Sequence, residues 1–96
     1  LYVIEGEEQH RSYEFSRERV VLGRGDASVV LKDAKVSRRH AEIELIGGYT
    51  PLLRDLTSAN GTYVNGKRVE DSVELKDGDR GRVGDTVIKF SILRSL

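Results

Sequence analysis

The sequence predicts an all-β fold, a two-sheet β-sandwich of short, mostly antiparallel strands. Apolar residues occur in short bursts that alternate with polar ones, and pairs built from Gly, Asn and Asp separate these bursts at short intervals. No ten-residue window shows the 3.6-residue apolar stripe of an amphipathic helix. The 96 residues support one domain, so we expect residues 1–96 to share a single core.

Five segments carry the clearest strand pattern. Between residues 41 and 45, Ala41, Ile43 and Leu45 alternate with two glutamates. This period of two predicts a strand with Glu42 and Glu44 on its solvent face. A long strand rich in β-branched residues is expected near the carboxyl end. In chain order, the predicted strands are residues 1–4, 13–15, 19–22, 41–45 and 86–93.

Two Asn-Gly pairs, at positions 60–61 and 65–66, lie five residues apart. Asn-Gly favours the type I′ turn, which needs positive φ at both central residues. We therefore expect two tight reversals with a very short strand, Tyr63-Val64, between them. Residues 75–84 predict a turn followed by a glycine-spaced strand, and they lack the carboxylates of a calcium loop.

The composition excludes several function classes. Sixteen basic and 16 acidic residues give zero formal net charge, which argues against non-specific nucleic-acid binding. The absence of cysteine excludes a disulfide framework and a thiolate metal site, and we expect no metal or cofactor. No apolar run approaches the ~18 residues that span a membrane, so we expect no membrane contact by this domain. Since no initiator Met or signal peptide is visible, we expect a piece of a larger intracellular protein, cytoplasmic or nuclear.

Two polar segments contain the donors that an oxyanion requires. Gly23-Arg24-Gly25 follows an apolar strand directly, which places the guanidinium of Arg24 on an exposed bend. Residues 36–40 combine Ser37, two arginines and a histidine just before another strand. Hydrogen bonds from charged donors are roughly twice as strong as neutral ones, and a phosphate favours such a cluster. Solvated turns, or a basic kinase target site at Ser37, are the alternatives.

Two further side chains, His40 and Asn60, are candidates for ordering the loops or holding a ligand. A lone histidine before a strand is more often a packed, hydrogen-bonded residue than a base or ligand. No carboxylate is placed nearby to orient His40 for activation of Ser37, so a hydrolase is not expected. The amide of Asn60 offers two donors and one acceptor, which suit a clamp on an extended peptide backbone.

Taken together, these segments resemble the forkhead-associated (FHA) domain family from about residue 2 to residue 93. The resemblance rests on Gly23-Arg24, then Ser37-Arg38-Arg39-His40, then Ser58-Ala59-Asn60-Gly61-Thr62-Tyr63-Val64-Asn65-Gly66, in this order. It implies a β-sandwich of about eleven strands in two sheets. Loops at one end would bind a peptide that a Ser/Thr kinase has phosphorylated on threonine, without catalysis.

The resemblance also implies roles for individual residues. Arg24, Ser37 and Arg38 would contact the phosphate, and Asn60 would hold the peptide main chain on either side of the phosphothreonine. Three further residues would serve as framework of the loops: Gly23, His40 and Gly61.

Specificity is expected to come from residues at the margin of the cluster, namely Lys35, Ser58 and Ala59. Lys35 could meet an acidic residue a few positions after the phosphothreonine. Some family members carry a hydroxyl residue at the position of Ala59, which cannot donate a hydrogen bond here. A phosphate-independent interaction domain is the alternative function. Such relatives usually lack the Arg or the Ser that this sequence retains at positions 24 and 37.

Overall fold

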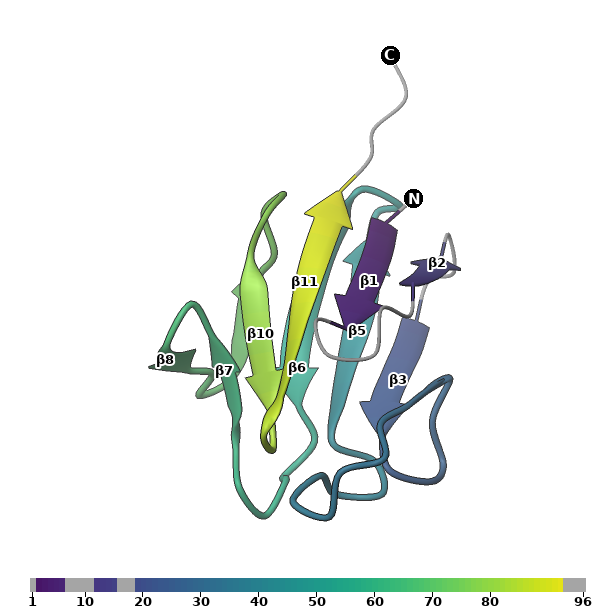
Figure 1. The fold of residues 1–96 in the computed structure, drawn as a ribbon. Coiled ribbons are helices and arrows are strands. Elements are labelled where there is room, and N and C mark those ends of the chain that lie inside the picture. The colour runs from purple at the N-terminus through teal and green to yellow at the C-terminus, as the bar shows by residue number, and fades with distance from the viewer. Residues whose placement is uncertain (1, 7–11, 16–18, 93–96) are drawn as a thin grey trace.

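The computed structural model describes residues 2–6, 12–15 and 19–92, and these form eleven strands in two facing sheets (Figure 1). The six-stranded sheet has the order β2 (Ser12–Phe15), β1 (Tyr2–Gly6), β11 (Thr86–Ile92), β10 (Arg80–Val83), β7 (Thr62–Val64), β8 (Lys67–Arg68). The five-stranded sheet has the order β4 (Val29–Val30), β3 (Arg19–Gly23), β5 (Ala41–Ile46), β6 (Thr50–Asp55), β9 (Ser72–Glu74).

These sheets confirm the predicted all-β sandwich. Every strand pair of the described residues is antiparallel except β3 with β4. The described residues contain no helix, and therefore none long enough to cross a membrane. The five predicted strands correspond to β1, β2, β3, β5 and β11, although Leu1 and Leu93 lie outside the described residues.

Alternation along the strands builds the core between the sheets. In β10, Gly81 and Val83 are buried whereas Arg80 and Arg82 are exposed, as expected for a strand with one face on the core. The largest fully buried side chain is Phe90 on β11. It shares one apolar cluster with residues of the other sheet, such as Leu22, Ile43 and Leu53.

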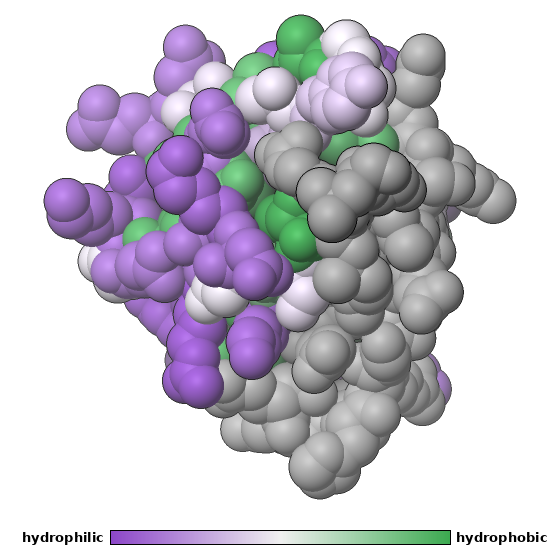
Figure 2. Space-filling view, turned by 90° about the horizontal axis from the view of Figure 1, so that it is seen from above, coloured by the Kyte–Doolittle hydropathy of each residue, from purple (hydrophilic) through white to green (hydrophobic). Residues whose placement is uncertain are grey.

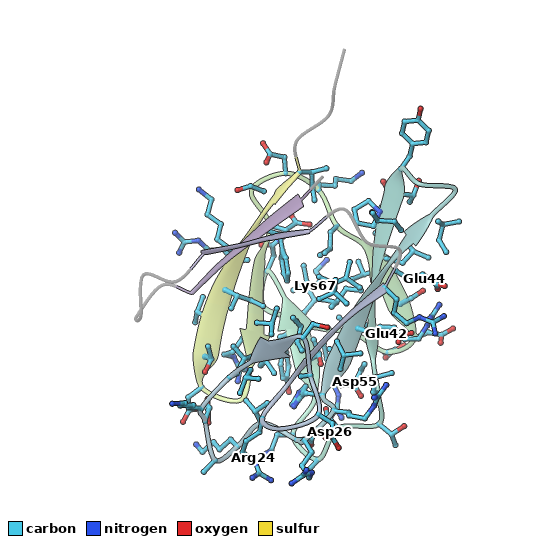
Figure 3. All side chains as sticks on the ribbon, turned by 90° about the vertical axis from the view of Figure 1, so that its right-hand side faces the viewer. Arg24, Asp26, Glu42, Glu44, Asp55 and Lys67 are labelled. Atoms are coloured by element: carbon cyan, nitrogen blue, oxygen red, sulfur yellow. The ribbon has the colours of Figure 1, made fainter. Side chains whose placement is uncertain are left out.

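The outer face of β5 differs from the prediction. Glu42 was expected in solvent, but it is only 7% exposed. Arg54 on β6 contacts Glu42 at 2.9 Å and Glu44 at 3.3 Å, while Arg19 on β3 pairs with the same two carboxylates. The glutamates do lie on the face turned away from the other sheet (Figure 3), but arginines of the neighbouring strands cover them. The aliphatic parts of Arg19 and Arg54 shield this face, because long cationic side chains lie along a surface and keep only the charged group in water.

The two Asn-Gly pairs adopt different conformations. Asn65 and Gly66 have φ of 50° and 84°, as a type I′ turn requires, and they join β7 to β8 as predicted. At the other pair only Gly61 has positive φ, at 85°, and no hairpin forms. The prediction of a reversal at Asn60-Gly61 was wrong, because β6 and β7 belong to different sheets and this loop crosses between them.

The loops that hold the predicted site gather at one end of the sandwich. The connections from β3 to β4, from β4 to β5 and from β6 to β7 all lie at the lower end of the molecule in Figure 1. The start of β1 and the end of β11, where Tyr2 pairs with Ile92, lie at the opposite end. The topology therefore brings three segments that are distant in sequence to one tip.

Candidate functional site

Two of the loops are joined by backbone hydrogen bonds. The amide of Arg24 donates to the carbonyl of Ser37 at 3.0 Å, and the amide of Gly25 donates to that of Arg38 at 3.3 Å. This close approach requires glycine at position 23, because an added Cβ there would lie 2.1 Å from the carbonyl oxygen of Arg38. Gly23 thus allows residues 24–25 and residues 37–38 to run side by side.

The guanidiniums of Arg24 and Arg38 lie on these joined loops. Nε of Arg24 donates to the carbonyl of Val36 at 3.0 Å, which directs the side chain across the second loop. Arg38 lies against Gly25, where an added Cβ would be 3.2 Å from its guanidinium carbon, and it pairs with Asp26 at 3.6 Å. Figure 3 shows Arg24 and Asp26 together at the lower tip of the molecule. Both guanidiniums therefore keep donors available to a ligand at this tip.

Ser37 connects this pair of loops to the third. Its Oγ accepts a hydrogen bond from the backbone amide of Ala59 at 3.1 Å. Because this contact uses a lone pair of the hydroxyl, the hydroxyl proton stays available for donation to a ligand. Ala59 itself is exposed beside Ser37.

His40 is fully buried, and from beneath it connects the loop of Ser37 to the loop of Gly61. Its Nδ1 accepts from the amide of Ser37 at 3.0 Å, which places the proton of the neutral ring on Nε2. Nε2 is 2.8 Å from the carbonyl of Gly61, to which it donates. The main chain of His40 is also bonded to Leu22 and Leu56, so the ring is held firmly in place.

Asp55 orders the third loop, and sequence reasoning missed it. Its carboxylate accepts from the amide of Ser58 at 3.1 Å, from the Ser58 hydroxyl at 2.6 Å and from the Thr62 hydroxyl at 2.7 Å. Oγ of Ser58 in turn accepts from the amide of Gly61 at 2.9 Å. Partial burial acts to raise the pKa of Asp55, but the bonds from Ser58 and Thr62 outweigh it and hold the pKa below its ordinary value. An Asp three residues before a Ser is the signal that could have indicated such a local turn.

Asn60 and Lys35 meet at the flank of the cluster. The amide nitrogen of Asn60 donates to the carbonyl of Lys35 at 2.8 Å, and the ammonium of Lys35 lies 3.2 Å from the carboxylate of Asp85. Asp33, also missed from the sequence, accepts hydrogen bonds from the amides of Lys35 and Asp85 and from the hydroxyl of Thr86. The backbone bond from Lys35 is the main cause that lowers the pKa of Asp33. The turn between β10 and β11 therefore supports the loop that carries Lys35.

The structure thus brings ten sequence-predicted residues to one end of the sandwich. Arg24, Ser37 and Arg38 supply cationic and hydroxyl donors from two adjoining loops, and Asn60 lies beside them with Ala59. The hydroxyl of Ser58 is engaged within its own loop, whereas Lys35 extends to the surface. The described residues hold no cluster of three or more potential metal ligands. The guanidinium and hydroxyl donors of Arg24, Ser37 and Arg38 suit an anion with several acceptor oxygens. The last three of the ten predicted residues lie beneath or between the loops: Gly23, His40 and Gly61.

Comparisons with known proteins show similarity to FHA domains. A model of the FHA domain matches residues 20–84. Among curated proteins, the FHA domain-containing protein FhaA of Mycobacterium tuberculosis is 44% identical over 79 residues, which are 81% of this chain and 15% of FhaA. The glycogen accumulation regulator GarA of Mycolicibacterium smegmatis is 48% identical over 65 residues, 68% of this chain and 40% of GarA. The chain therefore spans less than half the length of either relative.

A solved structure extends the likeness to the whole fold. It comes from a study of phosphothreonine-dependent FHA domain interactions and superimposes with a TM-score of 0.91. The sequences are 36% identical, and the match covers 98% of each chain.

Proposed function

The chain belongs to the FHA domain family, and we propose that it binds phosphothreonine peptides through the loops that hold Arg24, Ser37, Arg38 and Asn60. The observation that carries this proposal is the hydrogen-bonded pair of loops that places two guanidiniums and a serine hydroxyl at one exposed tip. The partner is a protein that a Ser/Thr kinase has phosphorylated. Since such kinases use intracellular ATP, an intracellular setting belongs to the same proposal.

The phosphate supplies most of the binding energy. At neutral pH a phosphothreonine carries a charge of about −1.5 to −2 and three strong acceptor oxygens. Hydrogen bonds to charged groups contribute roughly 1.5–3 kcal/mol each, so Arg24, Ser37 and Arg38 together contribute ~4.5–9 kcal/mol. Micromolar affinity requires about 8 kcal/mol, which leaves only a small share for the peptide itself. The unphosphorylated peptide should therefore bind very weakly.

Asn60 holds the peptide main chain next to the phosphate. Its amide nitrogen is 2.8 Å from the carbonyl of Lys35, which fixes the amide plane at the margin of the phosphate site. The side-chain oxygen and the second amide hydrogen are left to bond the extended backbone on either side of the phosphothreonine. Gly61, with its positive φ, lets the loop turn directly after this residue.

Binding proceeds without catalysis in this proposal. A serine hydrolase needs a histidine nitrogen that accepts the proton of the serine hydroxyl. Here Nδ1 of His40 accepts from the backbone amide of Ser37, and Nε2 is committed to the carbonyl of Gly61. Neither ring nitrogen is available to activate Ser37.

The choice of peptide sequence depends on Lys35 and Ala59. Lys35 recognises an acidic residue a few positions after the phosphothreonine, although it must leave its ion pair with Asp85 to do so. A peptide library with no acidic preference at these positions would remove this role. Ala59 has no hydroxyl, so Ala59→Ser should add a donor near the phosphate and strengthen binding by about two- to tenfold.

The decisive test measures the affinity for matched threonine and phosphothreonine peptides by calorimetry. Wild type should prefer the phosphorylated form by at least about a hundredfold. Arg24→Ala should cost about 2–4 kcal/mol, as loss of a cationic partner of a bound anion does. Arg39→Ala is the matched control, because Arg39 is an exposed arginine on the adjoining loop, next to Arg38. It should change the affinity less than about threefold.

Two results would contradict the proposal. Equal affinities for the two peptides would favour a phosphate-independent interaction domain. Normal phosphopeptide binding by Arg24→Ala would show that the phosphate binds elsewhere.

A further inference from the structure

Two arginines flank a tyrosine on the outer face of the six-stranded sheet. Arg82 on β10 stands directly opposite Tyr63 on β7, and Tyr63 stands directly opposite Arg68 on β8. Directly opposed residues of antiparallel strands lie on the same face. The guanidinium carbon of Arg82 is 4.2 Å from the centroid of the Tyr63 ring, within cation–π distance. We call these three residues the arginine row.

The arginine row adjoins the proposed peptide site. A Cβ added to Gly61 would lie 3.1 Å from Nε of Arg68, so this guanidinium packs on the backbone of the third loop. Gly61 directly follows Asn60, the proposed clamp of the peptide main chain. A bound polypeptide that continues past Asn60 on this side therefore meets Arg68 first.

No carboxylate of the described residues neutralises the positive charge of the arginine row. Neither Arg68 nor Arg82 forms an ion pair with a carboxylate of the described part of the chain. Within the described residues, Nη1 of Arg82 donates a hydrogen bond to the carbonyl of Gly84 at 3.1 Å. On the opposite sheet, by contrast, arginines and glutamates compensate one another, as between Arg54 and Glu42. Between these two outer faces, the arginines that lack a carboxylate partner among the described residues therefore lie on β8 and β10, at Arg68 and Arg82.

The surroundings of the row indicate the path of a ligand. Figure 2 shows hydrophilic residues over the side of the molecule where β7 and β8 lie. Arg68 also lines a groove with Lys67 and Lys76, but the carboxylates of Glu70, Asp71 and Glu74 in the same groove would repel an anion there. Next to the row, Lys89 on β11 stands opposite Arg80 on β10. On its other side, Lys89 stands opposite Glu5 on β1. An anionic segment thus fits best along the sheet from Arg68 over Tyr63 to Arg82.

We propose that the arginine row binds an acidic segment of the same polypeptide whose phosphothreonine occupies the loops. The inference rests on the proposed function and assigns a second anchoring surface to it. Adjacent strands lie about 4.8 Å apart, so the row from β8 to β10 spans ~10 Å, the length of about three extended residues. Glutamates or aspartates within such a stretch would contact both guanidiniums, and the tyrosine ring would pack against the aliphatic part of their side chains.

The test compares phosphopeptides that share one core sequence and differ only in an extension. Four extended peptides carry an acidic (Asp-Glu) or a neutral (Ser-Gln) block, about four to nine residues before or after the phosphothreonine. Affinities are measured by fluorescence anisotropy for wild type, Arg82→Ala, Arg68→Ala and the control Lys89→Ala. The measured quantity is the ratio of affinities for acidic and neutral extensions, which cancels any effect of a variant on the loops themselves.

For extensions on one side of the phosphothreonine, the acidic peptide should bind wild type at least about fivefold more tightly than the neutral peptide at low salt. Each exposed ion pair contributes a factor of about 1.5–5. This ratio should approach one at ~0.5 M salt, where screening is strong. Arg82→Ala and Arg68→Ala should each reduce it at least twofold, and Lys89→Ala should preserve it.

The outcomes separate this inference from the proposed function. If the core phosphopeptide does not bind wild type, the proposed function fails. If the core binds but the acidic extension adds nothing, or the ratio is the same in the arginine variants, the arginine row has no such role. A single-stranded oligonucleotide of matched charge is added as a competitor of the acidic extension. If it competes as strongly as an acidic peptide does, the arginine row is a general polyanion surface, and the choice of an acidic segment is overturned.

Discussion

Replacement of Gly23 by Ala tests how the loop of Arg24 and the loop of Arg38 are held together. The added Cβ would lie 2.1 Å from the carbonyl oxygen of Arg38 and 2.8 Å from its carbonyl carbon. Ordinary contact begins at 3.4 Å, so the oxygen and the new carbon must separate by a further 1.3 Å. Both contacts are with backbone atoms, which no side-chain rotation can relieve.

The magnitude follows from what this separation breaks. It disrupts the hydrogen bonds from Arg24 to Ser37 and from Gly25 to Arg38. Each contributes about 0.5–1.5 kcal/mol, and overpacking of a tight contact costs about 1–3 kcal/mol. Gly23→Ala should therefore lower the free energy of unfolding by about 2–6 kcal/mol, which is a large fraction of the total stability of a small domain.

Urea denaturation monitored by circular dichroism measures this loss, with Gly25→Ala as the matched control. A Cβ on Gly25 would meet only the guanidinium of Arg38, at 3.2 Å, and this flexible group can move aside. Gly25→Ala should change the unfolding free energy by less than about 1 kcal/mol. Equal stability of the two variants would refute the reasoning, because it would show that the loops can part without cost.

Three further substitutions probe other parts of the site and the fold. His40→Ala should cost about 2–4 kcal/mol in urea denaturation, because it empties a buried position and breaks two loop contacts; a loss below ~0.5 kcal/mol would contradict this role. Since the folded state lowers the pKa of Asp55 from 3.8, its carboxylate stabilises the fold above that pH and loses this effect as the pH falls through the lowered pKa. The stability difference between wild type and Asp55→Asn should therefore be constant above about pH 5 and shrink below pH 3.8; a difference that does not change with pH would contradict it. Gly66→Ala, at φ of 84°, should cost about 1 kcal/mol while peptide affinity stays unchanged, and weakened binding would show that the β7–β8 hairpin supports the site.

The fold class could be predicted from the sequence because its signals are local. Alternation of apolar residues and short turns identify strands such as β5 and β11 within a few residues. The conformation of a turn was harder to predict, since Asn60-Gly61 and Asn65-Gly66 are the same dipeptide. The second joins adjacent strands of one sheet and reverses tightly. The first crosses between sheets, and Asn60 instead bonds Lys35, a contact that no local pattern encodes.

The site could be predicted only as a set of exposed donors. Arg24, Ser37 and Arg38 stand out because phosphate chemistry favours guanidinium and hydroxyl groups. The carboxylates that order the loops do not stand out. Asp33 acts on Asp85 and Thr86, more than fifty positions away in the chain, and such a partnership follows from the topology alone. The burial of Glu42 could not be predicted either, because the arginines that cover it come from strands on either side.

The central claim is that one tip of the sandwich, at Arg24, Ser37 and Arg38, receives the phosphate. Amide chemical shifts of the 15N-labelled domain, followed during titration with a phosphothreonine peptide, test it most directly. The largest changes should fall within residues 23–26, 35–39 and 58–61, and the unphosphorylated peptide should leave these resonances in place. Equal changes with both peptides, or changes concentrated around the β5–β6 turn at the opposite end, would contradict the account.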